Sequence, residues 1–292
     1  MNAPFSQQQH LIESSNWINN LVDGNSGLTL RVKQTLFCDA SPFQKIEVFE
    51  TYGFGRILAL AGMIVLTERD EHIYNEMITH PVMLAGTPPR SVCIIGGGDG
   101  GALREVLKHD SVKKVTVVEI DRQVTETVKR FFPSMGGGFD DSRTELVFND
   151  GYAWLEASNR TFDVIIIDSY DPAGPVQSLE TGNFFELVKK ALTPETGRAV
   201  LQASSPDLNR DKIRNTMKEL CRFFLWNNPY LATIPSLPNG ICSFLLCRQQ
   251  KNREIQWSEN ADKIAEFCGY FAPQLLTGAF CLPRSSLEIF FG

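Results

Sequence analysis

A glycine run in front of a helix-like segment contains one carboxylate, Asp99. Gly96, Gly98 and Gly101 fit the spacing G-x-G-x-x-G, and the run directly follows the apolar, strand-like stretch "SVCIIG". Turns of this kind hold a nucleotide against backbone N–H groups, which favour anions. Because Asp99 would repel a pyrophosphate, the run predicts a nucleoside ligand that carries a positive charge.

Acidic side chains also follow the next three strand-like segments. Glu119 ends "KVTVVE", Asp150 follows "TELVF", and Asp168 ends "FDVIIID", with Asp171 three residues further on. The carboxyl ends of parallel strands meet at one edge of a sheet, so these groups should surround one ligand. Any of them could instead cap a helix, above all Asp150 in front of Gly151. Together they predict a site for a nucleoside and a cation, as in S-adenosyl compounds, which join adenine and ribose to a sulfonium.

The segments that position these residues change in character along the chain. Residues 28–67 consist of short β-branched and apolar stretches separated by turn-prone residues, which predicts a small antiparallel sheet. From Ser91 onward strand-like and helix-like segments alternate, which predicts an α/β fold with a mostly parallel sheet and helices on both faces. Between the two regions, Thr67 is a candidate helix cap with Asp70 as its partner.

Composition narrows the function classes. The net charge of −6 argues against a nucleic-acid partner, and no apolar run is long enough to span a membrane. The N-terminus does not resemble a signal peptide, and the seven cysteines form no CxxC pair, so we expect reduced thiols and a cytoplasmic protein. The four histidines form no HExxH-like cluster, so no metal site is predicted.

With these residues in view, the sequence resembles the spermidine synthase (polyamine aminopropyltransferase) family over nearly its whole length. The resemblance is carried by "FQKIEVFE", "GFGRILALAG", "TERDEHIYNEMITH", "IIGGGDGGALREVLKH", "VEID", "NDGYAWL", "FDVIIIDSYDPAGP", "TIPSLPNG" and "GAFCLP". It implies an N-terminal β-domain, residues 1–67, and a Rossmann-like, methyltransferase-type catalytic domain, residues 68–292. It also implies a homodimer or homotetramer.

The resemblance further implies the reaction. The family transfers the aminopropyl group of decarboxylated S-adenosylmethionine to a diamine and releases 5′-methylthioadenosine. For this chain we expect putrescine as the acceptor, giving spermidine. The donor is a co-substrate, so no further cofactor is expected, and the partners are small amines. This donor ends in an ammonium where S-adenosylmethionine has a carboxylate as well, so Asp99 would select it.

Carried over position by position, the resemblance assigns donor binding to Gln44, Gly96, Gly98, Asp99, Glu119, Asp150 and Gly151. It assigns catalysis to Asp168 as general base and to Tyr74, which would orient the attacking nitrogen. It assigns the acceptor amine to Asp171, Tyr74 and Gln202. Two of these residues could have a purely structural role instead. Tyr74 could be a packing residue of a helix, and Gln44 an exposed polar residue of a strand.

Five positions depart from the family pattern on the acceptor side. Ala61 replaces an aspartate, Val65 a glutamine, Gln177 and Ser204 glutamates, and Leu237 a tyrosine. Each change removes a polar or acidic group. A buried ammonium without a partner is costly. Either the acceptor is a longer or less polar amine, such as cadaverine or agmatine, or putrescine binds weakly, or other residues compensate.

Two further readings stay open. An S-adenosylmethionine-dependent amine methyltransferase could use the same scaffold, but Asp99 would repel the carboxylate of its donor. A non-catalytic paralogue that binds nucleoside or polyamine would explain the acceptor-side losses. Against it, Asp168, Asp171 and Tyr74 are all present, and a binding protein needs no base.

Overall fold

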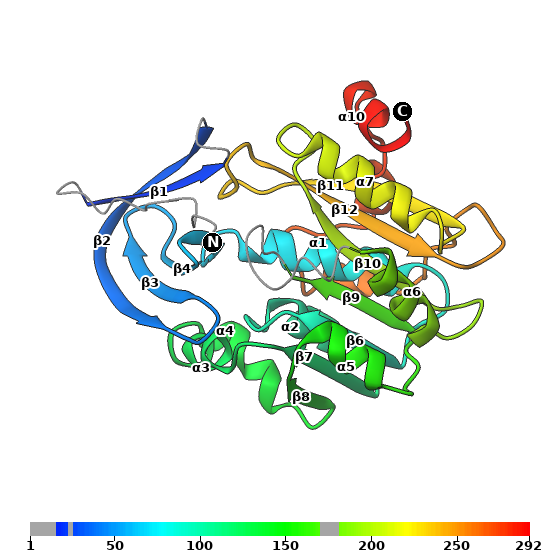
Figure 1. Cartoon of the computed structure of the whole chain (residues 1–292), viewed down its shortest axis with the longest axis horizontal. Helices are drawn as coiled ribbons and strands as arrows, with labels where there is room; N and C mark the ends of the chain where they lie inside the picture. The colour runs from blue at the N-terminus through cyan, green and yellow to red at the C-terminus, as the bar shows by residue number, and fades with distance from the viewer. Residues whose placement is uncertain (1–15, 23–25, 170–180) are drawn as a thin grey trace, which may run out of the picture. The chain divides into compact units, whose positions relative to one another are not determined.

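The structure, a computed structural model, describes residues 16–22, 26–169 and 181–292. Its contacts divide the chain into two compact units (Figure 1). The first comprises the residues up to Glu71 together with Ile234–Ile241, and the second comprises His72–Thr233 and Cys242–Gly292. In the described part of the chain, every helix is too short or too polar to cross a membrane.

The first unit contains a five-stranded antiparallel sheet whose strands pair in chain order. The strands are β1 (Trp17–Val22), β2 (Ser26–Ala40), β3 (Lys45–Thr51), β4 (Arg56–Leu60) and β5 (Met63–Thr67). The antiparallel sheet predicted from the β-branched stretches is therefore confirmed. Its core is the set of buried apolar side chains Ile18, Leu30, Phe49, Ile57, Ala59 and Ile64.

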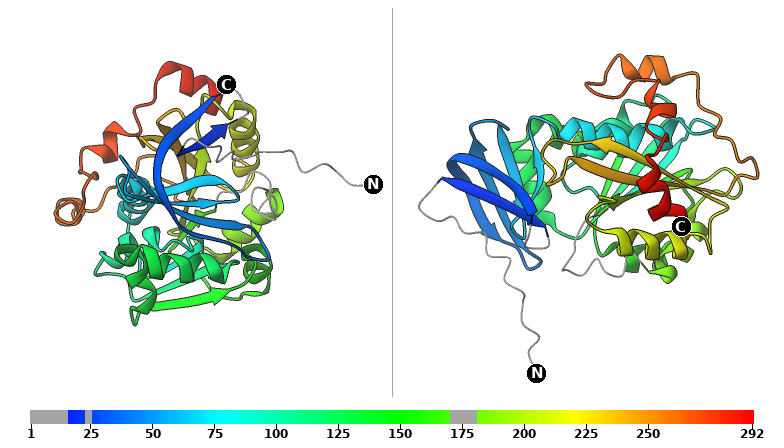
Figure 2. Two further views of the ribbon diagram at one scale, coloured as in Figure 1. Left: turned by 90° about the vertical axis from the view of Figure 1, so that its left-hand side faces the viewer. Right: turned by 90° about the horizontal axis from the view of Figure 1, so that it is seen from above.

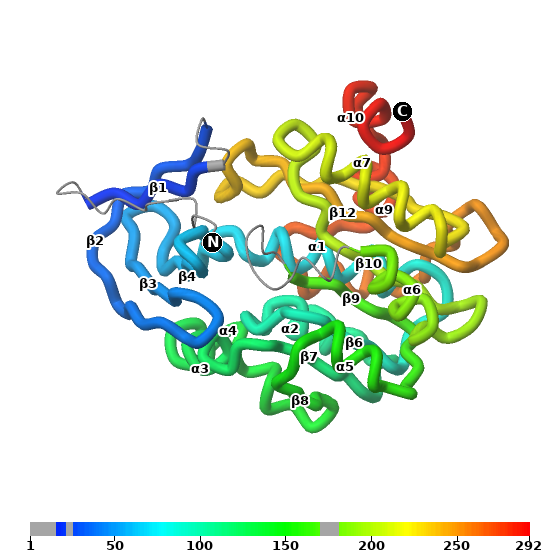
Figure 3. Tube along the Cα trace, in the orientation of Figure 1, coloured from blue at the N-terminus to red at the C-terminus, as the bar shows by residue number. Residues whose placement is uncertain are grey.

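Strand β2 is long and bent, as the Cα trace shows (Figure 3). Its register against β3 shifts twice, between Val32 and Gln34 and between Thr35 and Phe37. An extra residue in one strand bends that strand and increases its twist. The two irregularities therefore account for the curvature of this sheet, which is drawn in blue in the two further views of Figure 2.

The second unit contains a seven-stranded sheet in the order β11-β12-β10-β9-β6-β7-β8. Its strands are β6 (Ser91–Gly96), β7 (Lys114–Glu119), β8 (Thr144–Phe148), β9 (Val164–Asp168), β10 (Arg198–Ser204), β11 (Trp226–Thr233) and β12 (Ile241–Arg248). The pairs from β8 to β10 are parallel, and β12 pairs antiparallel to β10. The predicted α/β class with a mostly parallel sheet is confirmed.

Helices connect these strands and extend the chain beyond them. They are α1 (Glu71–Leu84), α2 (Gly101–Leu107), α3 (Arg122–Phe131), α4 (Pro133–Gly136), the 3₁₀ turn η1 (Gly137–Asp140), α5 (Gly151–Ala157), α6 (Gly182–Ala191), α7 (Arg210–Leu220), α8 (Ala261–Ala265), α9 (Leu275–Gly278) and α10 (Arg284–Phe291).

The strand order reverses at β6, which has β7 on one side and β9 on the other. In open α/β sheets the carboxyl ends of the strands diverge at this switch point, and ligands bind in the crevice that results. The chain passes from β6 through the glycine run into α2 at this position. The topology therefore places Asp99 at the switch point.

The two faces of this sheet are covered by different helices. Apolar residues of α5, α6, α7 and α10 pack in one cluster with alternate strand residues such as Ile167 and Leu201. Successive strand residues point to opposite faces, so Asp168 and Gln202 face the other side. Arg198 of β10 is four residues before Gln202 and so points to the same face. Its guanidinium donates hydrogen bonds to the carbonyls of Val82 and Met83 in α1 and of Thr87 just after it, so α1 covers this face.

Helix α1 begins later than the capping pattern predicts. It starts at Glu71, so Thr67 ends strand β5 instead of capping the helix. The Thr67 hydroxyl donates to Asp70 Oδ1 at 2.5 Å, and the Ser236 N–H donates to Asp70 Oδ2 at 2.7 Å. The predicted cap at Thr67 is wrong because Asp70 is buried and binds these two donors just before the helix starts.

Candidate active site

The glycine run is held against the end of β9. The Gly97 N–H donates to the backbone carbonyl of Asp168 at 3.0 Å. Gly96 has φ 81°, a left-handed conformation that glycine adopts without strain, and a Cβ there would collide with the same carbonyl. This contact explains why a glycine ends β6, and it brings Asp168 next to the turn.

Glu119, at the end of β7, binds the other side of the turn. Its Oε2 accepts from the Gly98 N–H at 3.0 Å, and its Oε1 accepts from the Asp121 N–H at 2.8 Å. A Cβ on Gly98 would lie 2.6 Å from Oε2, so a larger residue would push the Glu119 carboxylate away from the turn. Burial raises the pKa of Glu119 to about 7, and the two N–H donors only partly offset that effect.

Tyr74 and Asp168 form a hydrogen-bonded pair behind the turn. The Tyr74 hydroxyl donates to Asp168 Oδ1 at 2.7 Å and lies 3.1 Å from Gln202 Oε1. The hydroxyl has one proton, so it donates to one of these oxygens at a time. Burial and the Asp168 charge raise the pKa of Tyr74 well above its usual value, so this group is a donor and not a base.

The carboxyl group of Asp168 is only partly satisfied. Its Oδ2 is buried and has no hydrogen-bond partner within residues 16–22, 26–169 and 181–292. Burial and then the charge of Asp99 raise the pKa of Asp168 to about 7, while the Tyr74 hydrogen bond opposes the shift. A buried acceptor with an open lone pair can bind a proton or an N–H donor.

Asp99 adds the third carboxylate of the crevice. Its Oδ1 accepts from the Gly101 N–H at 2.9 Å, at the start of α2. The charge of Asp99 raises the pKa of both Asp168 and Glu119, which shows that the three groups act on one another. A cationic ligand would relieve this repulsion, so the arrangement favours a positively charged guest.

Asp150 lies two strands away, at the end of β8. Its Oδ1 accepts from the Ala153 N–H at 2.8 Å and so caps α5, which begins at Gly151. The helix-capping role that the sequence allowed for Asp150 is therefore present in the structure. Capping uses one carboxylate oxygen and does not by itself exclude a ligand contact.

The structure does not relate two of the predicted residues to the crevice. Gln44 belongs to the first unit, where its N–H donates to Ser41 Oγ at 3.1 Å in the turn after β2. Asp171 lies outside the described residues, as does Gln177. Their assigned roles stay predictions.

The structure adds two residues that the sequence patterns did not indicate. Asn75, buried on α1, occupies the space where Gly101 would carry a Cβ. Phe244 of β12 lies with its ring 5.6 Å from that of Tyr74. For Asn75 the available signal was its place directly after Tyr74. Phe244 has no such signal, because it faces α1 only as a result of its position in the alternation of side chains along β12.

Family models and the sequences of known proteins identify the same kind of protein as the geometry of the site. The family model for the spermine/spermidine synthase domain matches residues 71–257, and that for the spermidine synthase tetramerisation domain matches residues 16–68. The polyamine aminopropyltransferase of Bacillus mycoides (strain KBAB4) is 37% identical over 268 residues, which cover 92% of this chain and 96% of that protein. That of Thermoanaerobacter sp. (strain X514) is 36% identical over 274 residues, covering 94% and 98%.

Solved structures give the same result. A spermidine synthase in complex with the transition-state analogue AdoDATO has a TM-score of 0.89 and 30% identity, with 98% of each chain covered. The spermidine synthase from Thermotoga maritima has the same TM-score and identity, with 98% of this chain and 97% of that chain covered. The chain belongs to the spermine/spermidine synthase family and is an aminopropyltransferase.

Proposed function

We propose that the chain transfers the aminopropyl group of decarboxylated S-adenosylmethionine to putrescine, giving spermidine and 5′-methylthioadenosine. The observation that supports this most directly is the Tyr74–Asp168 pair, whose carboxyl group keeps one buried oxygen without a partner in the described chain. That oxygen is suited to take a proton from an attacking amine.

Donor binding is proposed for the residues around the glycine turn. Asp99 pairs with the donor's ammonium, and Glu119 accepts hydrogen bonds from the ribose hydroxyls. Asp150 and Gly151 lie at the adenine. Gly96 and Gly98 allow the backbone of the turn to approach the donor closely. The mutual repulsion of Asp99, Glu119 and Asp168 supports a cationic donor, because a sulfonium and an ammonium would offset it.

Two further contacts complete the proposal. Gln44 reaches the methionine-derived part of the donor, and Asp171 binds the acceptor amine. Both rest on the family resemblance alone.

The chemistry needs a neutral amine. An alkylammonium has a pKa of about 10.4, so at neutral pH nearly all of the acceptor is protonated and cannot attack. Asp168 takes this proton, Tyr74 and Gln202 orient the nitrogen, and the nitrogen attacks the carbon next to sulfur. A C–N bond forms as the C–S bond breaks, and the electron pair stays on sulfur in the neutral thioether. Because the sulfonium is already a good leaving group, positioning supplies most of the acceleration.

The acceptor side is less acidic than the family pattern, and Ser204 illustrates this. It has φ 63°, its Oγ accepts from Asn209 Nδ2 at 2.8 Å, and its carbonyl accepts from Ser243 Oγ at 2.6 Å. The serine hydroxyl is thus used within the protein, where a glutamate would offer a charge to the far ammonium of a diamine. We therefore expect weak binding of putrescine, with cadaverine, agmatine or a longer amine as competing acceptors.

Assembly is proposed from the first unit. The family model that matches residues 16–68 is named for tetramerisation, and an antiparallel sheet can pair across a symmetry axis. A homodimer or homotetramer is the expected state, with small amines as the other partners.

A panel assay tests the proposal. Purified protein is given either decarboxylated S-adenosylmethionine or S-adenosylmethionine with putrescine, cadaverine, agmatine or spermidine, and the products are identified by mass spectrometry. We expect aminopropylated amine from the decarboxylated donor only. A methylated amine from S-adenosylmethionine would overturn the role of Asp99. Donor binding without any product would support the non-catalytic reading.

A further inference from the structure

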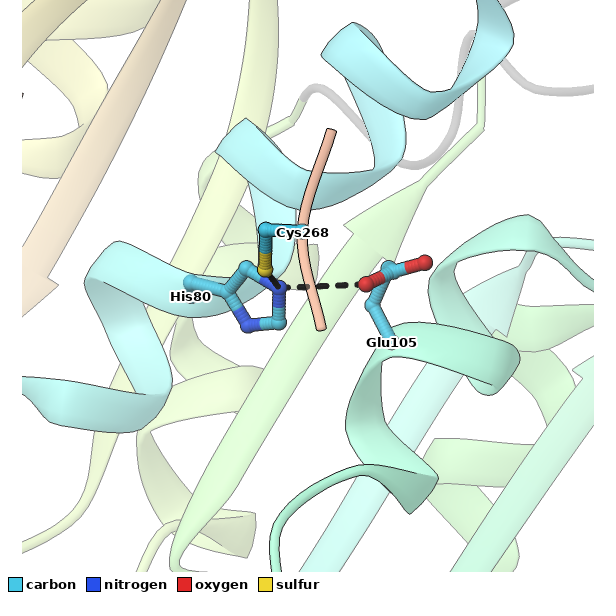
Figure 4. Close-up of side chains that lie close together, drawn as sticks. All are labelled: His80, Glu105 and Cys268. Carbon is cyan, nitrogen blue, oxygen red and sulfur yellow. Dashed lines mark hydrogen bonds and ion pairs between the residues drawn. The ribbon is translucent and has the colours of Figure 1, made fainter. Parts of the chain in front are cut away.

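Three side chains of metal-ligand type converge at a second location in the same unit (Figure 4). They are His80 on α1, Glu105 on α2 and Cys268 just after α8. The Nε2 of His80 lies 3.1 Å from Glu105 Oε2 and 3.2 Å from Cys268 Sγ, and the three ligand atoms lie within 4.8 Å of one another. His80 and Glu105 are fully buried, and Cys268 is half-buried.

The two distances from His80 Nε2 are close to those between ligand atoms of a tetrahedral zinc site, and Glu105 and Cys268 would move toward each other on binding the metal. Zinc binds imidazole nitrogen at about 2.0–2.1 Å, carboxylate oxygen at about 2.0–2.2 Å and thiolate sulfur at about 2.3 Å. In a tetrahedron such bonds place nitrogen about 3.3 Å from oxygen and about 3.5 Å from sulfur. We propose that His80, Glu105 and Cys268 bind one Zn²⁺, with the fourth position left to water.

The imidazole of His80 is already oriented for this role. Its Nδ1 lies 3.1 Å from Nε2 of His109, which is also buried. A histidine that binds a metal usually donates its second ring N–H to a neighbouring acceptor, and that bond fixes its tautomer. When His80 Nδ1–H donates to His109, the Nε2 lone pair points at Glu105 and Cys268.

The segment that carries Cys268 is fixed to the same helix. The carboxylate of Glu76, one turn before His80 on α1, accepts from the backbone N–H groups of Gly269, Tyr270 and Phe271 at 2.7, 2.8 and 2.6 Å. These three bonds follow Cys268 directly, so they hold its thiol close to His80. The segment that carries Cys268 is thus held beside α1 by Glu76, which is not one of the three proposed metal ligands.

A metal would have to replace a cation that is already present. Lys108 Nζ lies 2.5 Å from Glu105 Oε2, the oxygen that would bind zinc, and Arg104 Nε lies 2.8 Å from Oε1. Lys108 Nζ also donates to the Phe267 carbonyl at 2.9 Å, and because its side chain is 23% exposed it can leave Oε2 while it keeps that bond or turns to solvent. Zinc binding therefore exchanges one cation for another. Lys108 leaves Oε2, and the Cys268 thiol gives up its 3.2 Å hydrogen bond to the Ile264 carbonyl and releases its proton to water.

The proposed role is structural. The site would join α1, which carries Tyr74, to α2, which begins at the glycine turn, and to the C-terminal segment. None of its residues belongs to the crevice described above. Loss of the metal should therefore lower stability more than turnover.

Cobalt titration of the full-length chain, first freed of metal with a chelator, tests the site. We expect one Co²⁺ per chain with thiolate-to-cobalt charge-transfer absorption. Cys268→Ser should lose this absorption, while the matched control Cys281→Ser, at an exposed cysteine, should keep it. Zn²⁺ should raise the melting temperature of the wild type and of the control but not that of Cys268→Ser.

Lys108→Gln gives the sharper test, because it should increase the affinity for the metal, whereas Cys268→Ser should decrease it. It removes the competing cation and keeps all three ligands, so it should tighten cobalt binding about tenfold or more. Absent or unsaturable cobalt binding, charge-transfer absorption that persists in Cys268→Ser, or weaker binding by Lys108→Gln would each overturn the proposal. In those cases the cluster is a polar network that holds two helices and the C-terminal segment.

Discussion

The hydroxyl of Tyr74 donates a 2.7 Å hydrogen bond to Asp168, a residue 94 positions further along the chain. One residue comes from the first turns of α1 and the other from the last position of β9, so the pair exists only in the folded unit. The pair joins the proposed base to a group that can position the acceptor nitrogen.

Removing the phenol hydroxyl should slow the reaction and shift its pH dependence. The Tyr74 bond lowers the pKa of Asp168, so Tyr74→Phe lets that pKa rise above about 7. We expect kcat to fall about 10²-fold and the acidic limb of the kcat/KM profile to move to higher pH. Phe244→Leu, which alters only the neighbouring ring, is the control. An unchanged limb in Tyr74→Phe would contradict the assignment.

Asp168 should also make the free protein less stable at higher pH. Its pKa is raised to about 7 in the folded state, whereas an unfolded aspartate has a pKa of about 3.9. The folded state therefore binds this proton more tightly, and stability is lost as pH rises from about 4 to about 7.

Asp168→Asn should for this reason raise the unfolding free energy at pH 8 by on the order of 2 kcal/mol and have little effect near pH 4. Urea unfolding at the two pH values measures the difference. Equal effects at both values would show that the carboxyl group is not strained by its surroundings.

Asp99 should control the choice of donor. Asp99→Asn removes the partner of the ammonium and the charge that repels a carboxylate. The ratio of affinities for decarboxylated S-adenosylmethionine and S-adenosylmethionine should fall about tenfold to hundredfold. Glu119→Gln is the comparison, because a ribose contact affects both donors alike. Calorimetric titration with each donor gives the ratio, and a ratio unaffected by Asp99→Asn would refute this role.

Ala61, in the first unit, has a strained backbone conformation that a substitution can relieve. The β4–β5 hairpin turns through Ala61 at φ 47° and Gly62 at φ 81°, a pair of positive angles that favours Asn-Gly. Ala61→Asn should stabilise the chain by about 0.5–1 kcal/mol, while Gly62→Ala should destabilise it by a similar amount. Chemical denaturation of both variants checks the opposite signs.

Much of the second unit follows from patterns in the sequence. Buried strand-like segments ended by Gly96, Glu119 and Asp168 correctly predict parallel strands whose carboxyl ends carry these residues. Strand parity also explains why Asp168 and Gln202 face α1. The start of α1 was harder to predict, because the donor that binds Asp70 is Ser236, far away in the sequence.

Other contacts have no local signature at all. His80, Glu105 and Cys268 are brought together over 25 and 188 residues, so no ligand spacing marks them. Asn75 beside Gly101 is likewise visible only once α1 and α2 are packed. Periodicity predicts the elements, while packing between helices decides which polar groups meet.

The most direct test of the account is product analysis of the wild type and Asp168→Asn with decarboxylated S-adenosylmethionine and putrescine, together with donor binding by both proteins. We expect spermidine and 5′-methylthioadenosine in equal amounts from the wild type. Asp168→Asn should bind the donor normally and turn over at least about 10²-fold more slowly. Full activity in Asp168→Asn, or donor turnover without an aminopropylated amine, would contradict the proposed mechanism.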